Sequence, residues 1–177
     1  TLCILKQFQM SIIEDQIRTY LKQPILNPLF VTFTLKQKIQ FQSEVGTHLV
    51  DLDEVYMRTN FRHFSNRLNK KVFGNSFRRY GKRLKMVVVE EGKKNGVRLH
   101  QHTVIETPSH LDQLQFKSLI GEIWTNKTLW GYEDIRFDVP NKSKGDVSGW
   151  INYITKSKSK GRDLNSSIDW ENTYLVG

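Results

Sequence analysis

Residues 86–107 read MVVVEEGKKNGVRLHQHTVIET and contain the signals that decide the fold. The first part, Met86–Val89, is a short apolar run rich in β-branched residues, which predicts a buried strand. Gly92–Gly96 consists of turn residues. The segment Arg98–Thr107 then alternates between two sets of side chains and ends before Pro108, which predicts a second strand. The stretch therefore predicts an antiparallel β-hairpin.

The segments on either side of this hairpin predict further strands and helices. The expected strands are Leu29–Leu35 (LFVTFTL) and Asp134–Val139 (DIRFDV), and the expected helices are Ser11–Lys22, most of Leu52–Tyr80, a helix that begins at Ser109, and Asp146–Lys156. After the first helix, the order is strand, helix, strand, strand, helix, strand, helix, which is the split β-α-β arrangement. We therefore expect an α+β domain with a ferredoxin-like or RRM-like antiparallel sheet and helices packed on one face.

Two of the expected helices begin with capping sequences. Ser11 is followed three residues later by Glu14, and Ser109 is followed at the same distance by Asp112. A serine hydroxyl at a helix start accepts a hydrogen bond from a backbone N–H of the first turn. Helix starts at Ser11 and Ser109 are therefore expected.

The charge of the chain is strongly basic and unevenly distributed. Its 177 residues include 27 Lys and Arg against 18 Asp and Glu, a net charge of +9. Arg58–Lys85 contains ten basic residues and no acid, and Lys156–Arg162 contains four more. Like charges this close repel one another, so such segments are typical of a surface that meets an anionic partner. Nucleic acid is the commonest such partner, although an ordinary basic protein would show the same net charge.

The single cysteine, Cys3, excludes an intrachain disulfide and a cysteine-based zinc site. A lone thiol favours a reducing compartment. The sequence also has no run of about 18 apolar residues and no signal-peptide architecture. These features lead us to expect a cytoplasmic protein.

The second strand of the hairpin carries a pair of histidines, His100 and His102. Side chains two residues apart in a strand point to the same face, so both imidazoles can hold one ion. Glu90 and Glu91 end the preceding strand, and an antiparallel hairpin brings them back beside the histidines. Two imidazoles and one carboxylate suit a divalent ion such as Mn²⁺, with Mg²⁺ tolerated. The alternative is that the histidines are only polar positions on a solvated strand face.

Tyr153 and Lys156 lie one turn apart on the expected helix Asp146–Lys156, so their side chains share a face. A tyrosine hydroxyl is a poor nucleophile alone, and a neighbouring ammonium favours its phenolate form. Trp150 and Ile154 belong to the apolar stripe of the same helix, so the alternative is that Tyr153 is a core residue.

Three parts of the sequence together resemble the ordered motifs of HUH endonucleases, most of all the Rep initiators of small circular single-stranded DNA replicons. These parts are FVTFTL at Phe30–Leu35, EEG at 90–92 with LHQH at 99–102, and YITK at 153–156, and the resemblance runs from about Leu29 to Lys158. It implies that Phe33, Thr34 and Leu35 form a largely structural first motif. It also implies that His100, His102 and Glu91 bind the metal, that Tyr153 is the nucleophile and that Lys156 assists it.

One position departs from the pattern of this family. The residue between the two histidines is usually bulky and hydrophobic, whereas here it is Gln101. Gln101 would face away from the metal, so the departure concerns packing behind the strand more than metal binding. Only one tyrosine occupies the third motif, which suggests the single-tyrosine class.

The resemblance implies a site-specific endonuclease that nicks and joins single-stranded DNA and starts rolling-circle replication through a 5′-phosphotyrosine intermediate. The expected partners are single-stranded DNA at a replication origin, extended or as a hairpin, and the host replication machinery. The expected division of the chain is an N-terminal helical extension at 1–28, the endonuclease domain at 29–165, and a C-terminal tail or linker at 166–177.

Two other functions fit part of the same evidence. A single-tyrosine HUH transposase would share the histidine pair and the tyrosine. A non-enzymatic basic nucleic-acid-binding module on an RRM-like sheet would account for the charge and the fold, but not for the three ordered motifs. The sequence has neither a GxxxxGK[ST] phosphate loop nor the glycine-aromatic pattern of an RNA-binding strand.

Overall fold

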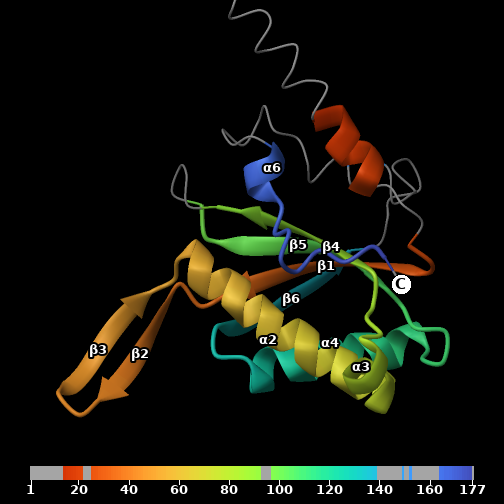
Figure 1. Ribbon diagram of the computed structural model, residues 1–177. Helices are drawn as coiled ribbons and strands as arrows, with labels where there is room; N and C mark the ends of the chain where they lie inside the picture. The colour runs from red at the N-terminus through yellow and green to blue at the C-terminus, as the bar shows by residue number, and fades with distance from the viewer. Residues whose placement is uncertain are drawn as a thin grey trace, which may run out of the picture.

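The computed structural model describes residues 14–21, 25–92, 97–138, 149, 152 and 164–176. Its centre is a four-stranded antiparallel sheet in the order β4-β5-β1-β6 (Figure 1). The strands are β1 (Pro28–Leu35), β4 (Met86–Glu91), β5 (His100–Glu106) and β6 (Gly131–Asp138). The central pair is therefore β5 and β1, which come from distant parts of the chain.

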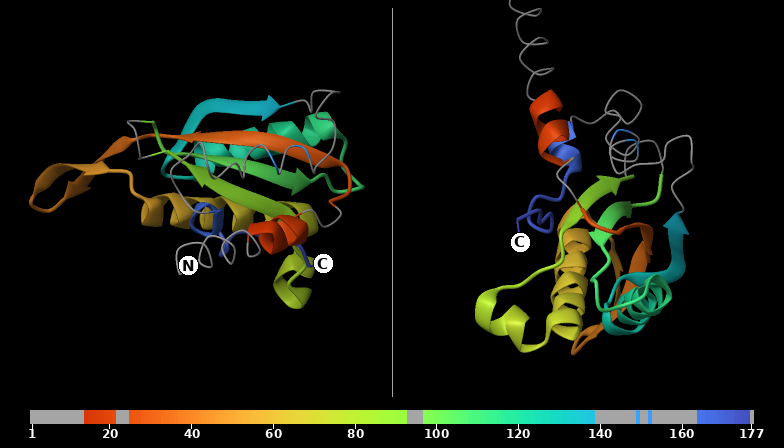
Figure 2. Two further views of the ribbon diagram at one scale, coloured as in Figure 1. Left: turned by 90° about the horizontal axis from the view of Figure 1, so that it is seen from above. Right: turned by 90° about the vertical axis from the view of Figure 1, so that its right-hand side faces the viewer.

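Helices α2 (Glu54–Phe73) and α4 (Gln113–Lys127) cover one face of this sheet (Figure 1, Figure 2). A short helix, α3 (Asn75–Tyr80), follows α2 after Gly74, whose φ of 55° favours glycine. The resulting order of strands and helices is ferredoxin-like, as the sequence predicts, and is consistent with an HUH-type fold. None of the helices in the described ranges has the length and apolar character needed to cross a membrane.

The main core lies between the sheet and these two helices. Alternate side chains of β1, among them Phe33 and Leu35, point to this face and are fully buried. The ring of Phe33 lies 5.5 Å from that of Phe61, 5.0 Å from that of Phe64 and 4.6 Å from that of Trp124, measured between centroids. Aromatic pairs at these separations stabilise the core beyond the burial of their area.

A second, smaller core covers part of the opposite face. Its sheet residues are Phe30, Val87, Val89 and Val104, and the residues packed on them include Leu21, Ile25, Leu164, Ile168 and Leu175. The segments on both sides of the central domain, which the sequence sets apart as an extension and a tail, therefore contribute side chains to this core. The division at 28 and 165 stays a prediction.

The C-terminal segment pairs with the edge strand β4. The backbone N–H of Asp169 donates to Val88 O at 3.0 Å, and Met86 and Tyr174 exchange two backbone hydrogen bonds. The short helix α6 (Leu164–Ser167) precedes these contacts. An exposed strand edge presents unpaired backbone groups, so this segment protects β4 from pairing with another chain.

A second hairpin, β2 (Lys38–Ser43) and β3 (Gly46–Asp51), projects away from the sheet (Figure 1). The sequence predicts no element for residues 36–51. Neither strand contains a buried residue, and Phe41 and Leu49 are exposed. The strand β2 does alternate, with Ile39 and Phe41 between polar residues, but β3 has adjacent Leu49 and Val50 and no alternation.

The start of α4 differs from the expectation. The helix is capped by Asp112, not by Ser109: the Asp112 side chain accepts from Gln115 N, and the Gln115 side chain accepts from Asp112 N. This reciprocal pair is a complete capping box, which satisfies two backbone N–H groups at once. The expected capping by Ser109 is therefore wrong by three residues.

We expect Asp169 to make the free energy of unfolding depend on pH. Burial raises the pKa of its carboxyl to about 6; hydrogen bonds from Asn172 oppose this rise and the charge of Glu90 adds to it. The folded protein therefore binds a proton more tightly than the unfolded chain. This stabilisation is present below about pH 4 and is lost as the pH rises through about 6, by at most about 1.4 kcal/mol per pH unit.

The variant Asp169→Asn has no ionisable group at this position, so its free energy of unfolding should lose the pH dependence that Asp169 contributes. Urea unfolding followed by circular dichroism between about pH 4 and 7 measures it as the difference in pH dependence between the variant and the parent. Glu133→Gln, at an exposed position, is the control and should keep the parent's dependence. Identical pH profiles for Asp169→Asn and the parent would contradict the assignment.

Candidate metal centre

The candidate metal centre lies where β4 ends and β5 begins. The antiparallel register places Glu91 opposite His100 and Val89 opposite His102. Side chains of Glu91, His100 and His102 therefore project from the same face of the sheet, which is the face that α2 and α4 leave free. The hairpin predicted from the sequence thus brings an acid beside both histidines.

The three side chains are close enough to bind one ion. Glu91 Oε2 lies 2.9 Å from His102 Nε2 and 3.5 Å from His100 Nε2. Each residue offers one ligand atom, a nitrogen or an oxygen, and these three atoms all lie within 4.8 Å of one another. All three residues are half-buried. The cluster can therefore hold a metal ion and still admit a ligand from solvent.

Both imidazoles are held by their Nδ1 atoms. His100 Nδ1 lies 2.8 Å from the carbonyl oxygen of Arg98, which can only accept a hydrogen bond. His102 Nδ1 lies 3.0 Å from Thr32 Oγ1, and the Thr32 hydroxyl donates to Asp138 Oδ2 at 3.3 Å. With the proton on Nδ1, each ring presents the lone pair of Nε2 toward Glu91. Such partners fix the tautomer and orientation of a metal-binding histidine.

The chemistry of this donor set fits a divalent ion. Two neutral imidazole nitrogens and one carboxylate oxygen are borderline-to-hard ligands, suited to Mn²⁺ and compatible with Mg²⁺. The Nδ1 atoms of both rings also make the outer hydrogen bonds that metal-binding histidines usually have. Among the described residues, Glu91, His100 and His102 form the group of histidine and carboxylate side chains whose ligand atoms are close enough to share one ion.

The adjacent acid, Glu90, points to the other face of the sheet. It is buried and accepts two hydrogen bonds from Arg58 of α2, from Nε at 2.7 Å and from Nη2 at 2.9 Å. These hydrogen bonds raise the pKa of the Arg58 guanidinium above its ordinary value. Glu90 is therefore occupied in a structural ion pair, and Glu91 is the acid that faces the histidines.

Gln101 lies behind the metal centre, as the alternation of the strand predicts. Its side chain is fully buried on the face covered by the helices, and neither of its polar atoms has a hydrogen-bond partner within the described part of the chain. A buried amide without partners is unfavourable. The presence of Gln101, where the HUH motif usually has a bulky hydrophobic residue, thus affects the core and leaves the arrangement of the histidines intact.

The remaining predicted site residues fall into two groups. Tyr153 and Lys156 lie outside the described residues. Phe33 and Leu35 are core residues, and Thr34 contacts β6 through its hydroxyl, which donates to Asp134 O. The first motif is therefore placed where a structural role is expected.

Thr32 and Asp138 belong to the site but are not identified from the sequence. Thr32 lies two residues before Thr34 in β1, opposite His102 in β5, and Asp138 ends β6. Alternation along β1 would have indicated the face of Thr32. Its contact with His102 also depends on the pairing of strands 70 residues apart, which no local signal reveals.

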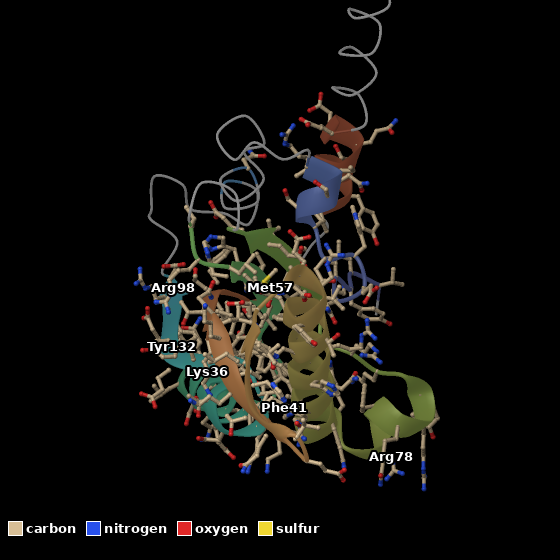
Figure 3. All side chains as sticks on the ribbon, turned by 90° about the vertical axis from the view of Figure 1, so that its left-hand side faces the viewer. Lys36, Phe41, Met57, Arg78, Arg98 and Tyr132 are labelled. Atoms are coloured by element: carbon tan, nitrogen blue, oxygen red, sulfur yellow. The ribbon has the colours of Figure 1, made fainter. Side chains whose placement is uncertain are left out.

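The surroundings of the metal centre carry exposed cations. Arg98 lies over the ring of Tyr132, 6.0 Å from its centroid, at the same end of the sheet (Figure 3). Arg136 lies opposite Thr32 in the register and forms an exposed ion pair with Asp134 at 3.2 Å. Exposed ion pairs are weak, so Arg136 can exchange this partner for a phosphate. The charged side chains beside the metal centre therefore include the cations Arg98 and Arg136 as well as the carboxylates Asp134 and Asp138.

Searches of protein-family models, curated proteins and solved structures with this chain found no match.

We expect Glu91→Ala to weaken the binding of Mn²⁺ by at least about 100-fold, because it removes a metal ligand rather than an outer partner. Isothermal titration calorimetry or electron paramagnetic resonance of free Mn²⁺ measures the affinity. Glu90→Gln is the matched control and should change stability more than affinity, because Glu90 is paired with Arg58. If only the Glu90 variant lost affinity for Mn²⁺, the carboxylate ligand would be Glu90 and the assignment of Glu91 would be wrong.

We expect Thr32→Val, which keeps the shape and removes the hydroxyl, to lower the affinity for Mn²⁺ by about tenfold, because His102 loses its orienting partner. Thr34→Val is the control, since the hydroxyl of Thr34 bonds to Asp134 O and not to a histidine. The same titration with both variants compares the two positions. Equal affinities for the two variants would show that Thr32 does not act through His102.

Proposed function

We propose that the chain is a metal-dependent endonuclease that nicks and rejoins single-stranded DNA with a tyrosine nucleophile, and that it initiates rolling-circle replication. The observation that carries this proposal is the cluster of Glu91, His100 and His102 on adjacent strands of a ferredoxin-like sheet. The order of the three sequence motifs and the net charge of +9 support it.

The residues of the cluster would hold the ion and keep it accessible. Glu91, His100 and His102 supply the ligand atoms, while Thr32 and the Arg98 carbonyl hold the rings in the required tautomer. A divalent ion, Mn²⁺ or Mg²⁺, would supply Lewis-acid stabilisation of negative charge on the scissile phosphate. The histidines lie on the face of the sheet opposite to α2 and α4 and are half-buried, so a DNA phosphate could approach the ion from that face.

Tyr153 and Lys156 are assigned to the reaction from the sequence. The phenolic oxygen of Tyr153 attacks the scissile phosphorus, and the bond from phosphorus to the 3′ oxygen breaks. The phenol loses its proton and the leaving oxygen gains one, so the products are a 5′-phosphotyrosine and a 3′-hydroxyl that a polymerase can extend. Lys156 lowers the cost of negative charge on the phenol or the phosphate. Attack by a later 3′-hydroxyl on the phosphotyrosine frees the tyrosine and seals the strand.

The open sheet face argues against a non-enzymatic RRM-like module. Such a module stacks bases on aromatic side chains at the centre of its sheet. In this protein the uncovered central positions of β1 and β5 carry Thr32, Thr34, His100 and His102. Phe30, on the same face, is buried in the second core. These positions suit metal binding and phosphate contact better than base stacking.

We expect the protein to form a covalent adduct with single-stranded DNA in the presence of Mn²⁺. A pool of random-sequence oligonucleotides, labelled at either the 5′ or the 3′ end, is incubated with the protein and resolved on a denaturing gel. The 3′ label should migrate with the protein and the 5′ label should be released, because the tyrosine retains the 5′ phosphate. Tyr153→Phe should abolish both the adduct and cleavage while DNA binding survives.

Tyr132→Phe is the control for this experiment, because Tyr132 is an exposed tyrosine at the metal-centre end of the sheet. It should form the adduct as the parent does. Cleavage that survives in Tyr153→Phe would contradict the assignment of the nucleophile. Binding of DNA without any adduct in the parent protein would favour the non-enzymatic module.

A further inference from the structure

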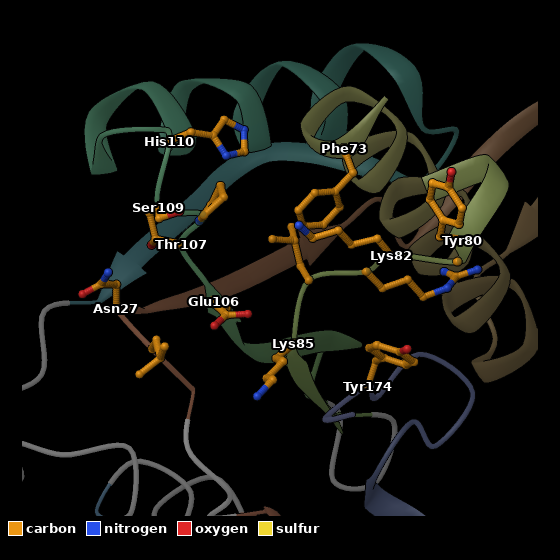
Figure 4. A pocket seen from close by; sticks show the side chains of 15 residues that line it. Asn27, Phe73, Tyr80, Lys82, Lys85, Glu106, Thr107, Ser109, His110 and Tyr174 are labelled. Carbon is orange, nitrogen blue, oxygen red and sulfur yellow. The ribbon is translucent and has the colours of Figure 1, made fainter. Parts of the chain in front are cut away.

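A cavity lies at the end of the sheet opposite to the metal centre. It has a volume of about 560 Å³ and is enclosed by the end of α2, the connection between α3 and β4, the end of β5 and Tyr174 (Figure 4). Lys85 precedes β4 and Glu106 ends β5, whereas Glu91 and His100 occupy the opposite ends of the same strands. The cavity therefore shares no residue with the metal centre.

The wall of this cavity is cationic. Lys82, Arg83 and Lys85 line it, and among the described residues none of the three forms an ion pair. Lys82 lies over the ring of Phe73, 5.0 Å from its centroid, which holds the side chain at the cavity (Figure 4). Glu106 is the one acid among the lining residues. An anionic ligand would therefore find uncompensated positive charge.

The cavity also contains features that a simple anion would not use. Tyr80 stands at its rim with 79% of its surface exposed. Thr107 lines the cavity, is 7% exposed, and its hydroxyl has no hydrogen-bond partner within the described part of the chain. That hydroxyl has almost no accessible surface, so the polar side chain that a ligand would meet at this end of the cavity is Glu106. The carboxylate of Glu106 can accept from an amino group but repels a free anion.

We propose that this cavity binds one nucleotide of a single-stranded DNA, with its base stacked on Tyr80 and its phosphate held by Lys82 and Lys85. A base offers an aromatic face to the tyrosine and a polar edge to Glu106, and the phosphate meets the cationic wall. The volume is within the range of small-ligand sites, roughly 300–1,000 Å³. Arg78 and Arg79 are exposed on the adjoining α3, so positive charge continues beyond the cavity along the path of a strand.

The test measures binding of a fluorescein-labelled single-stranded 12-mer, by anisotropy, in EDTA, so that neither the metal centre nor cleavage contributes. Tyr80→Ala should weaken binding roughly tenfold without changing its salt dependence, because stacking carries no charge. Lys82→Ala should weaken binding and reduce the slope of log affinity against log salt by about 0.7, the value for one phosphate of a single strand. Both positions are exposed, so the fold should be unaffected.

Lys127→Ala is the matched control, since it removes the same charge from an exposed position outside the cavity. If the Tyr80 and Lys82 variants bind DNA as the Lys127 variant does, the proposal is overturned. Because the assay contains no metal, an inactive nuclease would leave this result unchanged.

Competition with deoxycytidine monophosphate and with inorganic phosphate identifies the form of the ligand. Displacement by the nucleotide, lost in Lys82→Ala, means that the cavity also accepts a free nucleotide. Resistance to the nucleotide, with the two variants still defective, means that it accepts a nucleotide only within a strand. Displacement by phosphate and nucleotide at equal concentrations would show that the base contributes nothing, which overturns the proposal.

Discussion

The ion pair between Arg58 of α2 and the buried Glu90 of β4 determines which acid faces the histidines. A shift of one residue in a strand turns every side chain to the opposite face. Such a shift in β4 would turn Glu90 away from Arg58 toward the face of the histidines and turn Glu91 toward the helices. In the observed register the fully buried Glu90 is paired with Arg58, which avoids an uncompensated buried charge and leaves Glu91 on the face of the histidines. The geometry of the candidate metal centre therefore depends on a contact made on the other side of the sheet.

The same guanidinium connects the sheet to the C-terminal segment. Arg58 lowers the pKa of Asp169 while burial raises it, and Asn172 donates both to the Asp169 carboxylate and, at 3.1 Å, to Arg58 O. This network anchors the segment whose apolar residues complete the second core. Among the described residues, that core covers the part of the sheet face around Phe30 and does not include the histidines. The position of the metal centre thus follows from where the second core stops.

The hairpin at 86–107 is predictable because its signals, alternation and turn residues, are local. The choice between the two adjacent acids is not, because it depends on a partner in α2 that lies 32 residues earlier. Thr32 is missed for the same reason: it reaches His102 only through the pairing of β1 with β5. The β2–β3 hairpin is missed on different grounds, since the alternation of Ile39 and Phe41 in β2 is short and β3 has none. The roles of Tyr153 and Lys156 stay predictions.

The basic segment Arg58–Lys85 illustrates why charge in a sequence overstates the surface available to nucleic acid. Arg58 is paired with the buried Glu90, and Arg62 forms an exposed ion pair with Glu171, so both charges are partly neutralised. Arg83 donates to Asn66. The described cations of this segment without an ion pair concentrate toward α3 and the start of β4, where the cavity lies. Within the described ranges, folding therefore pairs two of the ten cations with acids. Five of the other eight lie between Arg78 and Lys85, beside the cavity and about 20 Å along the strands from the metal centre.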